Sequence, residues 1–254
     1  MKTVVYQSYR TMDVAPWIQR CLETVKDWTA QQGFAYHFVD DSLFDYVPIW
    51  YRDKVDHNIL LISDLARLEV AKELLAQGYE RTIWVDADIV VFDPRNFKID
   101  TMDEFAFCQE LWAAPDTTGK ITYRKRVHNA ICVFMQGNTF LEFYSNACLR
   151  MVQSKQRINP LDVGTNFLSS LFEMMPFPLI NNVGMFSPSI LYSIDHNQSE
   201  ILHRYRSLIG SPLQAANLCG SMINKPWFGE IIHEGLFNRA LDKLLSTRGD
   251  IVNY

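Results

Sequence analysis

Two aspartates, one residue apart, interrupt the most apolar run of the sequence. Asp86 and Asp88 lie in RTIWVDADIVVFDP, residues 81–94. Ionised carboxylates are costly to bury unless a partner compensates their charge. Side chains two residues apart on a strand point to one face, so past the strand end both can reach one hard cation, Mg²⁺ or Mn²⁺, which takes further ligands from phosphates. The pair predicts a site for a metal and a diphosphate; the alternative is an ordinary turn that ends at Asp93-Pro94.

The elements that must position this pair alternate between strand and helix. Apolar runs predict strands at 3–6, 34–39 and 82–85. Helical spacing of apolar residues lies between them, from 16 to 32 and from about 60 to 77. The second helix begins either near Ile59 or at Ser63, which would then cap it. This order predicts parallel strands, and ligands bind beyond the carboxyl ends of such strands, where Asp40, Asp86 and Asp88 fall.

The second half of the chain is less regular. Strands are predicted at 105–110 and 130–137, and the loop between them holds the basic cluster 123–126. Further predictions are a helix capped by Asn138 that runs to about Gln153, a loop entering a short helix over 159–172, and a last helix near 236–246. No confident element is predicted between about 180 and 236. One α/β domain, 1–254, with a Rossmann-like mixed sheet flanked by helices is the simplest interpretation.

The composition limits the classes of partner and the cellular compartment that we expect for this protein. The 254 residues carry a net charge of −5, which argues against nucleic acid because phosphate backbones select clustered Lys and Arg. The five cysteines are widely spaced and indicate buried free thiols in a reducing compartment. No apolar run approaches the roughly 20 residues of a membrane span, and the first strand leaves no room for a signal peptide. A cytoplasmic protein without a transmembrane segment is expected; peripheral contact with a membrane and the oligomeric state stay open.

The stretch SDLARLEVAKELLAQGYERTIWVDADIVVF, residues 63–92, resembles the centre of the A-type glycosyltransferase fold (GT-A). Members carry an Asp-x-x-Arg helix and then a strand that ends in Asp-x-Asp (the DXD motif). The sequence is similar to capsular-polysaccharide and mannosyltransferase-like enzymes and to clostridial glucosylating toxins. The resemblance implies metal-dependent transfer of a sugar from a UDP- or GDP-sugar to a hydroxyl of a glycan, lipid-linked or small-molecule acceptor, in polysaccharide or glycoconjugate synthesis. It implies a nucleotide-sugar-binding half, 1–100, and an acceptor-side half, 101–254.

The same resemblance assigns roles near the donor. Asp64 and Arg67 match the Asp-x-x-Arg element, which contacts the donor sugar and phosphate; the alternative is a surface ion pair one helical turn apart. Asp88 is implied to bind Mn²⁺ or Mg²⁺ directly, and Asp86 to reach the ribose or to hold the metal through water. Asn129, in HNAICVFMQGN, is implied to face the donor sugar; the alternative is a hydrogen bond to backbone at the start of a strand.

Three further residues are implied on the acceptor side and near the C-terminus. Asp162, in DVGTNFL, either binds sugar hydroxyls and serves as the base, or caps the following helix. His233 is preferred over His196 and His203 as a third metal ligand, since it follows an apolar pair and precedes a glycine-containing turn. Lys225, in NKPWFG, either closes over phosphates or belongs to a turn anchored by the tryptophan.

The first loop and the end of the second strand are implied to hold the nucleotide. QSYR contributes Gln7, Tyr9 and Arg10, with Tyr9 stacking on a base and Arg10 meeting phosphate. Asp40 is a candidate for a base or ribose contact. Ordinary loop polarity is the alternative for each of these residues.

Two other functions compete with sugar transfer. A phosphohydrolase of the haloacid-dehalogenase kind also has an apolar strand followed by D-x-D, with Asp86 as nucleophile and Asp88 as acid/base. Two strands and two helices precede the motif here, however, and no later acidic pair follows an apolar strand. The other competitor is a non-catalytic module that binds sugar nucleotides or glycans, because a fold does not fix an activity.

Overall fold

The computed structural model describes residues 1–101 and 103–253. Its helices are α1 (Pro16–Gln31), α2 (Ile49–Lys54), α3 (Ile59–Ala76), α4 (Phe140–Ser154), α5 (Phe167–Met174), α6 (Pro188–Asp195), α7 (Ser199–Ile209), α8 (Glu234–Ser246) and α9 (Asp250–Asn253). Its strands are β1 (Thr3–Ser8), β2 (Ala35–Val39), β3 (Arg81–Val85), β4 (Ile89–Val91), β5 (Phe105–Pro115), β6 (Ile121–Met135), β7 (Leu179–Ile180), β8 (Val183–Met185), β9 (Ala215–Asn217), β10 (Pro226–Trp227) and β11 (Glu230–Ile231). The structure also describes two 3₁₀ turns, η1 (Asp41–Tyr46) and η3 (Gly220–Met222), and one π-helical turn, η2 (Asp162–Asn166).

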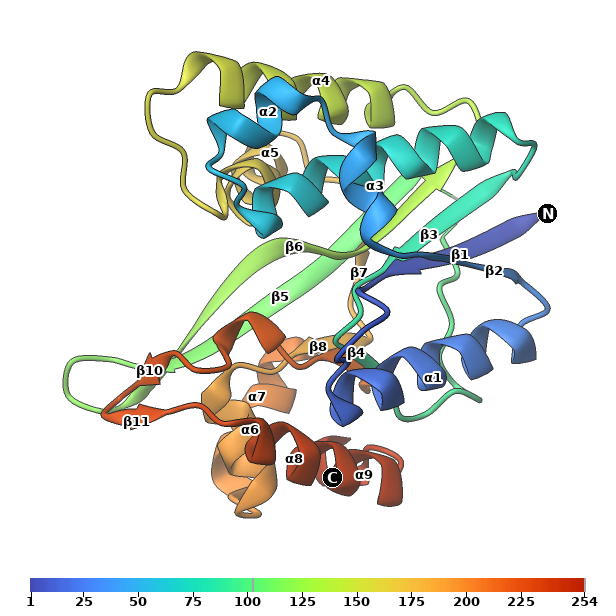
Figure 1. Ribbon diagram of the computed structural model, residues 1–254. Helices are drawn as coiled ribbons and strands as arrows, with labels where there is room; N and C mark the ends of the chain where they lie inside the picture. Colours follow the sequence, from blue (N-terminus) through green and yellow to red (C-terminus); the bar gives the residue numbers. More distant parts are fainter. Residues whose placement is uncertain (102, 254) are drawn as a thin grey trace.

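The main sheet is mixed and has the strand order β2-β1-β3-β6-β5-β7. Strand β1 pairs in parallel with both β2 and β3, whereas β6 is antiparallel to β3 and β5. The carboxyl ends of β1, β2 and β3 therefore meet at one edge. Helices cover both faces, with α3 and α4 on one side and α1 on the other (Figure 1). The predicted fold class, a mixed α/β sheet flanked by helices, is confirmed.

Strand β1 lies between two hydrophobic cores, and its successive residues face one core and then the other. Val4 and Tyr6 pack in the core beneath α3 and α4, and Val5 packs in the opposite core with Trp28 of α1. This alternation is the two-residue period of a strand that is buried on both faces. Helix α3 begins at Ile59, because the Asn58 side chain accepts hydrogen bonds from the backbone of the first turn and caps it.

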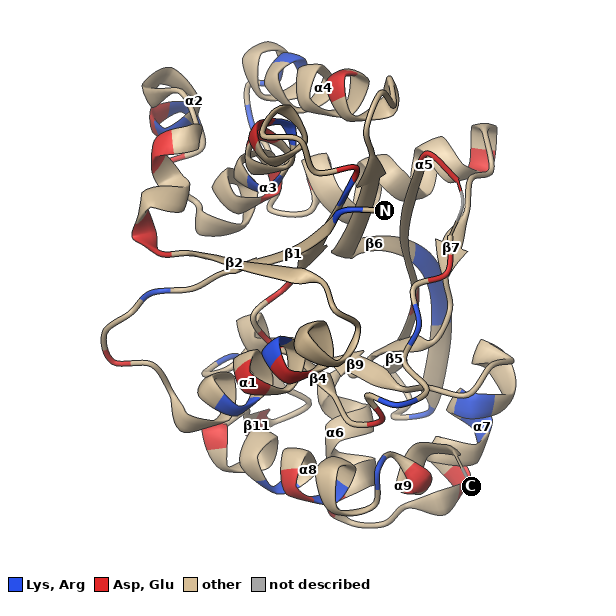
Figure 2. Ribbon diagram, turned by 90° about the vertical axis from the view of Figure 1, so that its right-hand side faces the viewer, with Lys and Arg blue, Asp and Glu red and all other residues tan. Residues whose placement is uncertain are grey.

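The basic cluster lies on a strand, so the loop prediction for residues 123–126 was wrong. Strands β5 and β6 form one long ribbon that pairs as far as Pro115 and Ile121. A tight turn closes it, in which the Asp116 side chain accepts from the backbone of Thr118 and Lys120. The basic residues colour the outer part of β6 in Figure 2. Polar side chains on a ribbon that extends beyond the main core obscured the strand pattern.

Residues 180–233 form a compact region that the sequence did not predict. Strands β4, β9 and β8 make a second sheet in the order β4-β9-β8, and α6, α7 and α8 pack around it (Figure 1). The strands of this sheet have only three residues each, and α6 has eight, so each is too short for a clear periodic signal. Helix α8 covers the predicted 236–246 and packs against α1.

Several smaller predictions are confirmed. All five cysteines are buried and free. The Asn138 side chain accepts from the backbone N–H of Leu141 at 2.9 Å, as expected of a residue that caps α4. Among the helices that the structure describes, none combines the length and apolar character needed to cross a membrane.

Candidate functional site

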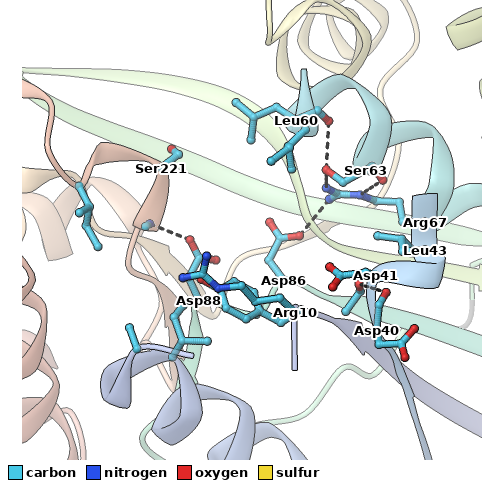
Figure 3. Close-up of a pocket in the computed structure, with 18 of the residues that line it drawn as sticks. Arg10, Asp40, Asp41, Leu43, Leu60, Ser63, Arg67, Asp86, Asp88 and Ser221 are labelled. Atoms are coloured by element: carbon cyan, nitrogen blue, oxygen red, sulfur yellow. Dashed lines mark hydrogen bonds and ion pairs between the residues drawn. The ribbon is translucent and has the colours of Figure 1, made fainter. Parts of the chain in front are cut away.

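A cavity of about 600 Å³ opens at the carboxyl ends of β1, β2 and β3. Its lining includes the predicted residues Tyr9, Arg10, Asp40, Arg67, Asp86 and Asp88 (Figure 3). Sheets of this kind bind ligands at this edge, and the volume falls within the range of small-molecule sites. Residues predicted from three separate strand ends and from α3 are thus brought to one cavity.

Asp86 directly follows a fully buried strand, β3, which fixes its position. Every residue of β3 is buried, and the backbone N–H of Asp86 continues the sheet by donating to the Ala130 carbonyl at 2.8 Å. Gln7, fully buried, donates from its side chain to the Asp86 carbonyl at 3.2 Å. The carboxylate oxygen Oδ1 accepts from Trp84 Nε1 at 2.6 Å and pairs with Arg67 at 3.1 Å. The second oxygen, Oδ2, is left for other partners.

Arg67 holds two carboxylates at once. Its Nη1 donates to Asp86 Oδ1 at 3.1 Å and to the Asn129 carbonyl at 2.7 Å, and its Nη2 lies 3.1 Å from Asp64 Oδ1. Its Nε donates to the Ser63 carbonyl at 3.0 Å, and the Ser63 hydroxyl takes the remaining Nη2 hydrogen. Asn129 closes the network by donating to Asp64 Oδ1 at 2.8 Å.

This network is buried, which bears on the two roles considered for the Asp-x-x-Arg pair. Asp64 is 6 % exposed and Arg67 is 5 % exposed, so theirs is not a surface ion pair. Four of the five N–H donors of Arg67 make hydrogen bonds within the protein, and its Nη2 also forms the ion pair with Asp64. Asp64 and Asn129 do not line the cavity. In this arrangement Arg67 acts mainly on the position of Asp86.

Asp88 is held from the far end of the chain. Asn217 donates from Nδ2 to Asp88 Oδ1 at 2.8 Å, and the backbone N–H of Gly220 donates to Oδ2 at 2.8 Å. The backbone N–H of Leu218 donates to the Asp88 carbonyl at 3.0 Å. Within the described chain, Asp88 has neutral hydrogen-bond donors and no ion pair with Lys, Arg or His.

The electrostatics of the site favour an added positive charge. Burial, and then the nearby Asp86 carboxylate, raise the pKa of Asp88 to about 7, against the hydrogen bonds from Gly220 and Asn217. Burial also raises the pKa of Asp86, although Arg67 and the Trp84 N–H oppose the shift. Burial raises the pKa of Asp64 to about 6, again against Arg67. Asp64 and Asp86 thus share one buried cation, Arg67, and Asp88 forms no ion pair within the described residues.

The residues present fit a divalent cation whose set of ligands a substrate would complete. Asp88 keeps free lone pairs on both oxygens, and Asp86 keeps Oδ2. The described residues contain no group of three His, Cys, Asp or Glu side chains able to hold a metal. Two carboxylates with waters and substrate phosphates are the usual ligand set of Mg²⁺ in such sites. The structure therefore does not bring His233 to the pair as a third ligand.

The entrance of the cavity combines an aromatic ring, a cation and a carboxylate. The Arg10 guanidinium lies 5.7 Å from the centre of the Tyr9 ring, and no described carboxylate forms an ion pair with it. Burial raises the pKa of Tyr9, with Asp88 and Glu234 adding to the effect, so both carboxylates lie near this ring. Asp40 faces the cavity and also caps η1, where hydrogen bonds from Ser42 lower its pKa.

Four other predicted residues lie outside the cavity lining: Gln7, which is fully buried, Asp162, Lys225 and His233. Asp162 does not cap the following helix either: its side chain accepts from the backbone N–H of Asn159, upstream of it, and pairs with Lys155 at 2.7 Å, whereas the cap position of α5 is Asn166. Lys225 is exposed and precedes the hairpin of β10 and β11, which Trp227 anchors through a hydrogen bond to a serine of α6. His233 is exposed at the start of α8.

Sequence reasoning missed the part of the cavity that comes from residues 217–234. Gly220, Ser221, Ile223, Asn224 and Glu234 line it, so both halves of the chain contribute. The available signal was the stretch AANLCGS, a short apolar strand followed by an asparagine and a glycine, which marks a turn. Nothing local in that stretch points to Asp88, since the contact spans 132 residues between Asp88 and Gly220.

Comparisons with known proteins give similarities to solved structures alone. No family model matches the sequence. No curated protein matches it either. The chain is similar to a glycosyltransferase involved in the glycosylation of the major capsid of PBCV-1, with 9 % identity, a TM-score of 0.47 and coverage of 87 % of this chain and 94 % of that one. It is similar to mouse xyloside xylosyltransferase 1, with 8 % identity, a TM-score of 0.47 and coverage of 87 % and 99 %. It is also similar to the glycosyltransferase GlyE of Streptococcus pneumoniae TIGR4, with 11 % identity and a TM-score of 0.44, where 99 % of this chain spans 62 % of that one.

Proposed function

We propose that this protein is a glycosyltransferase that moves a sugar from a nucleoside-diphosphate sugar, a UDP- or GDP-sugar, to a hydroxyl acceptor. The observation that carries the proposal is the pair Asp86 and Asp88 at the carboxyl end of β3. Both carboxylates have raised pKa values and line a cavity of about 600 Å³. Such a pair calls for a cation, and a cation with open positions calls for an anionic ligand such as a diphosphate.

In this proposal the residues divide into those that touch the donor and those that hold them in place. Tyr9 stacks against the base, Arg10 meets the phosphates, and Asp40 meets the base or the ribose. Asp86 and Asp88 would hold Mn²⁺ or Mg²⁺, which would supply positive charge against the departing diphosphate. Arg67 keeps Asp86 aimed into the cavity through the 3.1 Å ion pair, and its charge lies close to the developing negative charge.

The phosphohydrolase is less compatible with the arrangement. In it Asp86 would attack phosphorus through a carboxylate oxygen, and further acidic residues would gather beside it. The neighbour of β3 on one side is the antiparallel strand β6, which brings Asn129 rather than a carboxylate. No third carboxylate, His or Cys joins the pair within the described residues to form a metal site. A binding module without catalysis differs from a transferase only in turnover, so an activity measurement must distinguish the two.

The test is a nucleotide screen followed by a sugar screen. Thermal melting is measured with UDP and GDP, each with and without Mn²⁺, for the wild type and for Asp88→Asn. Stabilisation that needs both nucleotide and Mn²⁺ and is lost in Asp88→Asn supports the proposal. Transfer or slow hydrolysis of one UDP- or GDP-sugar then establishes catalysis, whereas binding without turnover indicates a binding module. Release of phosphate from sugar phosphates, lost in Asp86→Asn, would establish the phosphohydrolase instead.

A further inference from the structure

A short segment near the C-terminal end of the chain encloses the carboxylate of Asp88. Strand β9 pairs with β4 in the register Ile89 to Asn217, which places the segment 217–220 beside the turn that carries Asp88. Both carboxylate oxygens are engaged, one by the Asn217 amide and one by the Gly220 N–H, each at 2.8 Å. Two donors from one segment fix the position and the rotation of the carboxylate plane.

The Asn217 side chain is itself held in one orientation. It is 3 % exposed, and its Oδ1 accepts from the backbone N–H of Cys219 at 2.7 Å. That contact leaves the Nδ2 hydrogens to face Asp88, so the amide orientation is set by the hydrogen bonds on both of its ends. Asn217 thus links the backbone of its own loop to the carboxylate.

The backbone of the segment requires an unusual residue choice. Cys219 adopts a left-handed conformation, with φ 57° and ψ 52°, which is uncommon for a residue other than glycine. At Gly220 a Cβ atom would lie 2.8 Å from the Trp17 ring and 3.3 Å from Asp88 Oδ2. A larger residue would therefore push the Gly220 N–H away from the carboxylate. Strained backbone of this kind persists where the surroundings determine it, and it is enriched at functional sites.

We propose that Asn217 and Gly220 are positioning residues that hold the Asp88 carboxylate in the orientation needed to bind a divalent cation. The proposal rests on the proposed function for the identity of the ligand, but the contact itself exists without a metal. Groups that hydrogen-bond a metal-binding side chain set its geometry, and their removal weakens metal binding by roughly 10- to 100-fold. We name Asn217 to Gly220 the Asp88 clamp.

The first experiment measures cation binding against stability. Mn²⁺ is titrated into the protein in the presence of UDP, and separately of GDP, with free Mn²⁺ followed by electron paramagnetic resonance. Asn217→Ala is expected to weaken Mn²⁺ binding by roughly 10- to 100-fold. The control is Asn253→Ala, since Asn253 also makes two hydrogen bonds to the backbone of this region, at Leu213, but lies outside the cavity. Asn253→Ala is expected to lower the melting temperature and leave Mn²⁺ binding unchanged. Wild-type Mn²⁺ binding in Asn217→Ala, or equal losses in both variants, overturns the proposal.

A glycine pair tests the backbone donor in the same titration. Gly220→Ala is expected to weaken Mn²⁺ binding, because its Cβ displaces the N–H from Asp88. Gly235→Ala is the control, as its Cβ would meet only the mobile end of Arg239, at 3.1 Å, in the first turn of α8. Equal Mn²⁺ binding in the two alanine variants overturns the role of Gly220.

The second experiment needs no metal and separates this proposal from the proposed function. Melting temperatures are measured in EDTA for the wild type, Asp88→Ala, Asn217→Ala and the double variant. The drop caused by Asn217→Ala is expected to be smaller in the Asp88→Ala background, where the 2.8 Å contact no longer exists to be lost. Equal drops in both backgrounds overturn the clamp. A wild-type protein that binds no Mn²⁺ with either nucleotide refutes the cation site, and this melting cycle then decides the clamp alone.

Discussion

The substitution Arg67→Met should be the most damaging single change at the site to stability. It keeps much of the volume and removes the one charge that Asp64 and Asp86 share, at 3.1 Å each. The Arg67 and Asp64 side chains are 6 % and 9 % exposed, so the carboxylates are left buried without a cation. Breaking a buried pair in this way costs about 3–5 kcal/mol in the free energy of unfolding. For a chain of this size each kcal/mol lowers the melting temperature by roughly 2–4 °C, which predicts a loss on the order of 10 °C.

The pH dependence of this loss distinguishes charge from packing. Without Arg67, burial acts unopposed on Asp64 and Asp86, and their pKa values in the folded state rise further above those of the unfolded chain. Carboxyls whose pKa is raised on folding contribute stability that is present at low pH and is lost as the pH rises through the folded value. The difference between Arg67→Met and wild type should therefore widen from pH 5 to pH 8. Adding Asp64→Asn should recover part of the loss at pH 8, since one buried charge is removed.

Urea unfolding at pH 5 and pH 8 measures both effects. The control is Arg20→Met, because Arg20 pairs at 2.8 Å with Asp242 on the surface, where the side chains are 35 % and 64 % exposed. Exposed pairs of this kind contribute about 1 kcal/mol or less. If Arg67→Met costs no more than Arg20→Met at pH 8, the buried network does not stabilise the fold, and the role assigned to Arg67 is refuted. A loss of equal size at both pH values would indicate packing rather than charge.

Three other predictions concern the carboxylates. Asp88→Ala should abolish Mn²⁺-dependent nucleotide binding in calorimetry without unfolding the protein, because the cost of burying a carboxyl whose pKa is raised to about 7 offsets the hydrogen bonds that are lost. Mn²⁺ binding should strengthen as the pH rises from 6 to 8, since protons compete for Asp88. Without metal, the free energy of unfolding should fall from pH 4 to 6, because Asp64, with its pKa raised to about 6, ionises in that range. Asp64→Asn should flatten that fall in melting experiments. Gly164→Ala should cost about 1–3 kcal/mol in urea unfolding, because its Cβ would lie 2.7 Å from Asp64 Oδ2 and 3.1 Å from Asn129 Nδ2, and an unchanged midpoint would contradict this packing.

The parts of the fold that the sequence predicted are those encoded locally. The first three strands are apolar runs, α1 and α3 carry apolar residues at helical spacing, and Asp86 and Asp88 mark the strand end by their contrast with the apolar run. The short strands β8 and β9 have no such pattern, because three residues cannot show a period. Strand β9 pairs with β4, more than a hundred positions away along the chain, and β8 is placed by pairing with β9.

The sequence predicted many of the residues of the candidate site but not the contacts between them. The spacing of Arg67 and Asp64 identified them as a pair. The sequence could not show that α3 packs them against β3 and β6, where Asp86 and Asn129 accept hydrogen bonds from the guanidinium of Arg67. The sequence around Asn217 and Gly220 indicates only a turn, because their importance arises from contact with Asp88. Side chains that touch a ligand tend to carry chemically distinctive types, whereas the groups that orient them can be any amide in the right place.

The pairing of β4 with β9 also bears on when the site is assembled during synthesis. Asp88 leaves the ribosome long before Asn217, and the contact between them spans 129 residues. Chains grow and fold from the N-terminus, and distant pairings form late because loop closure must precede them. A nascent chain that has reached α7 already contains both aspartates and most of the main sheet, but nothing yet holds the second aspartate. The geometry for binding a cation is therefore acquired near the end of translation, and a chain cut short before β9 would keep the motif without its support.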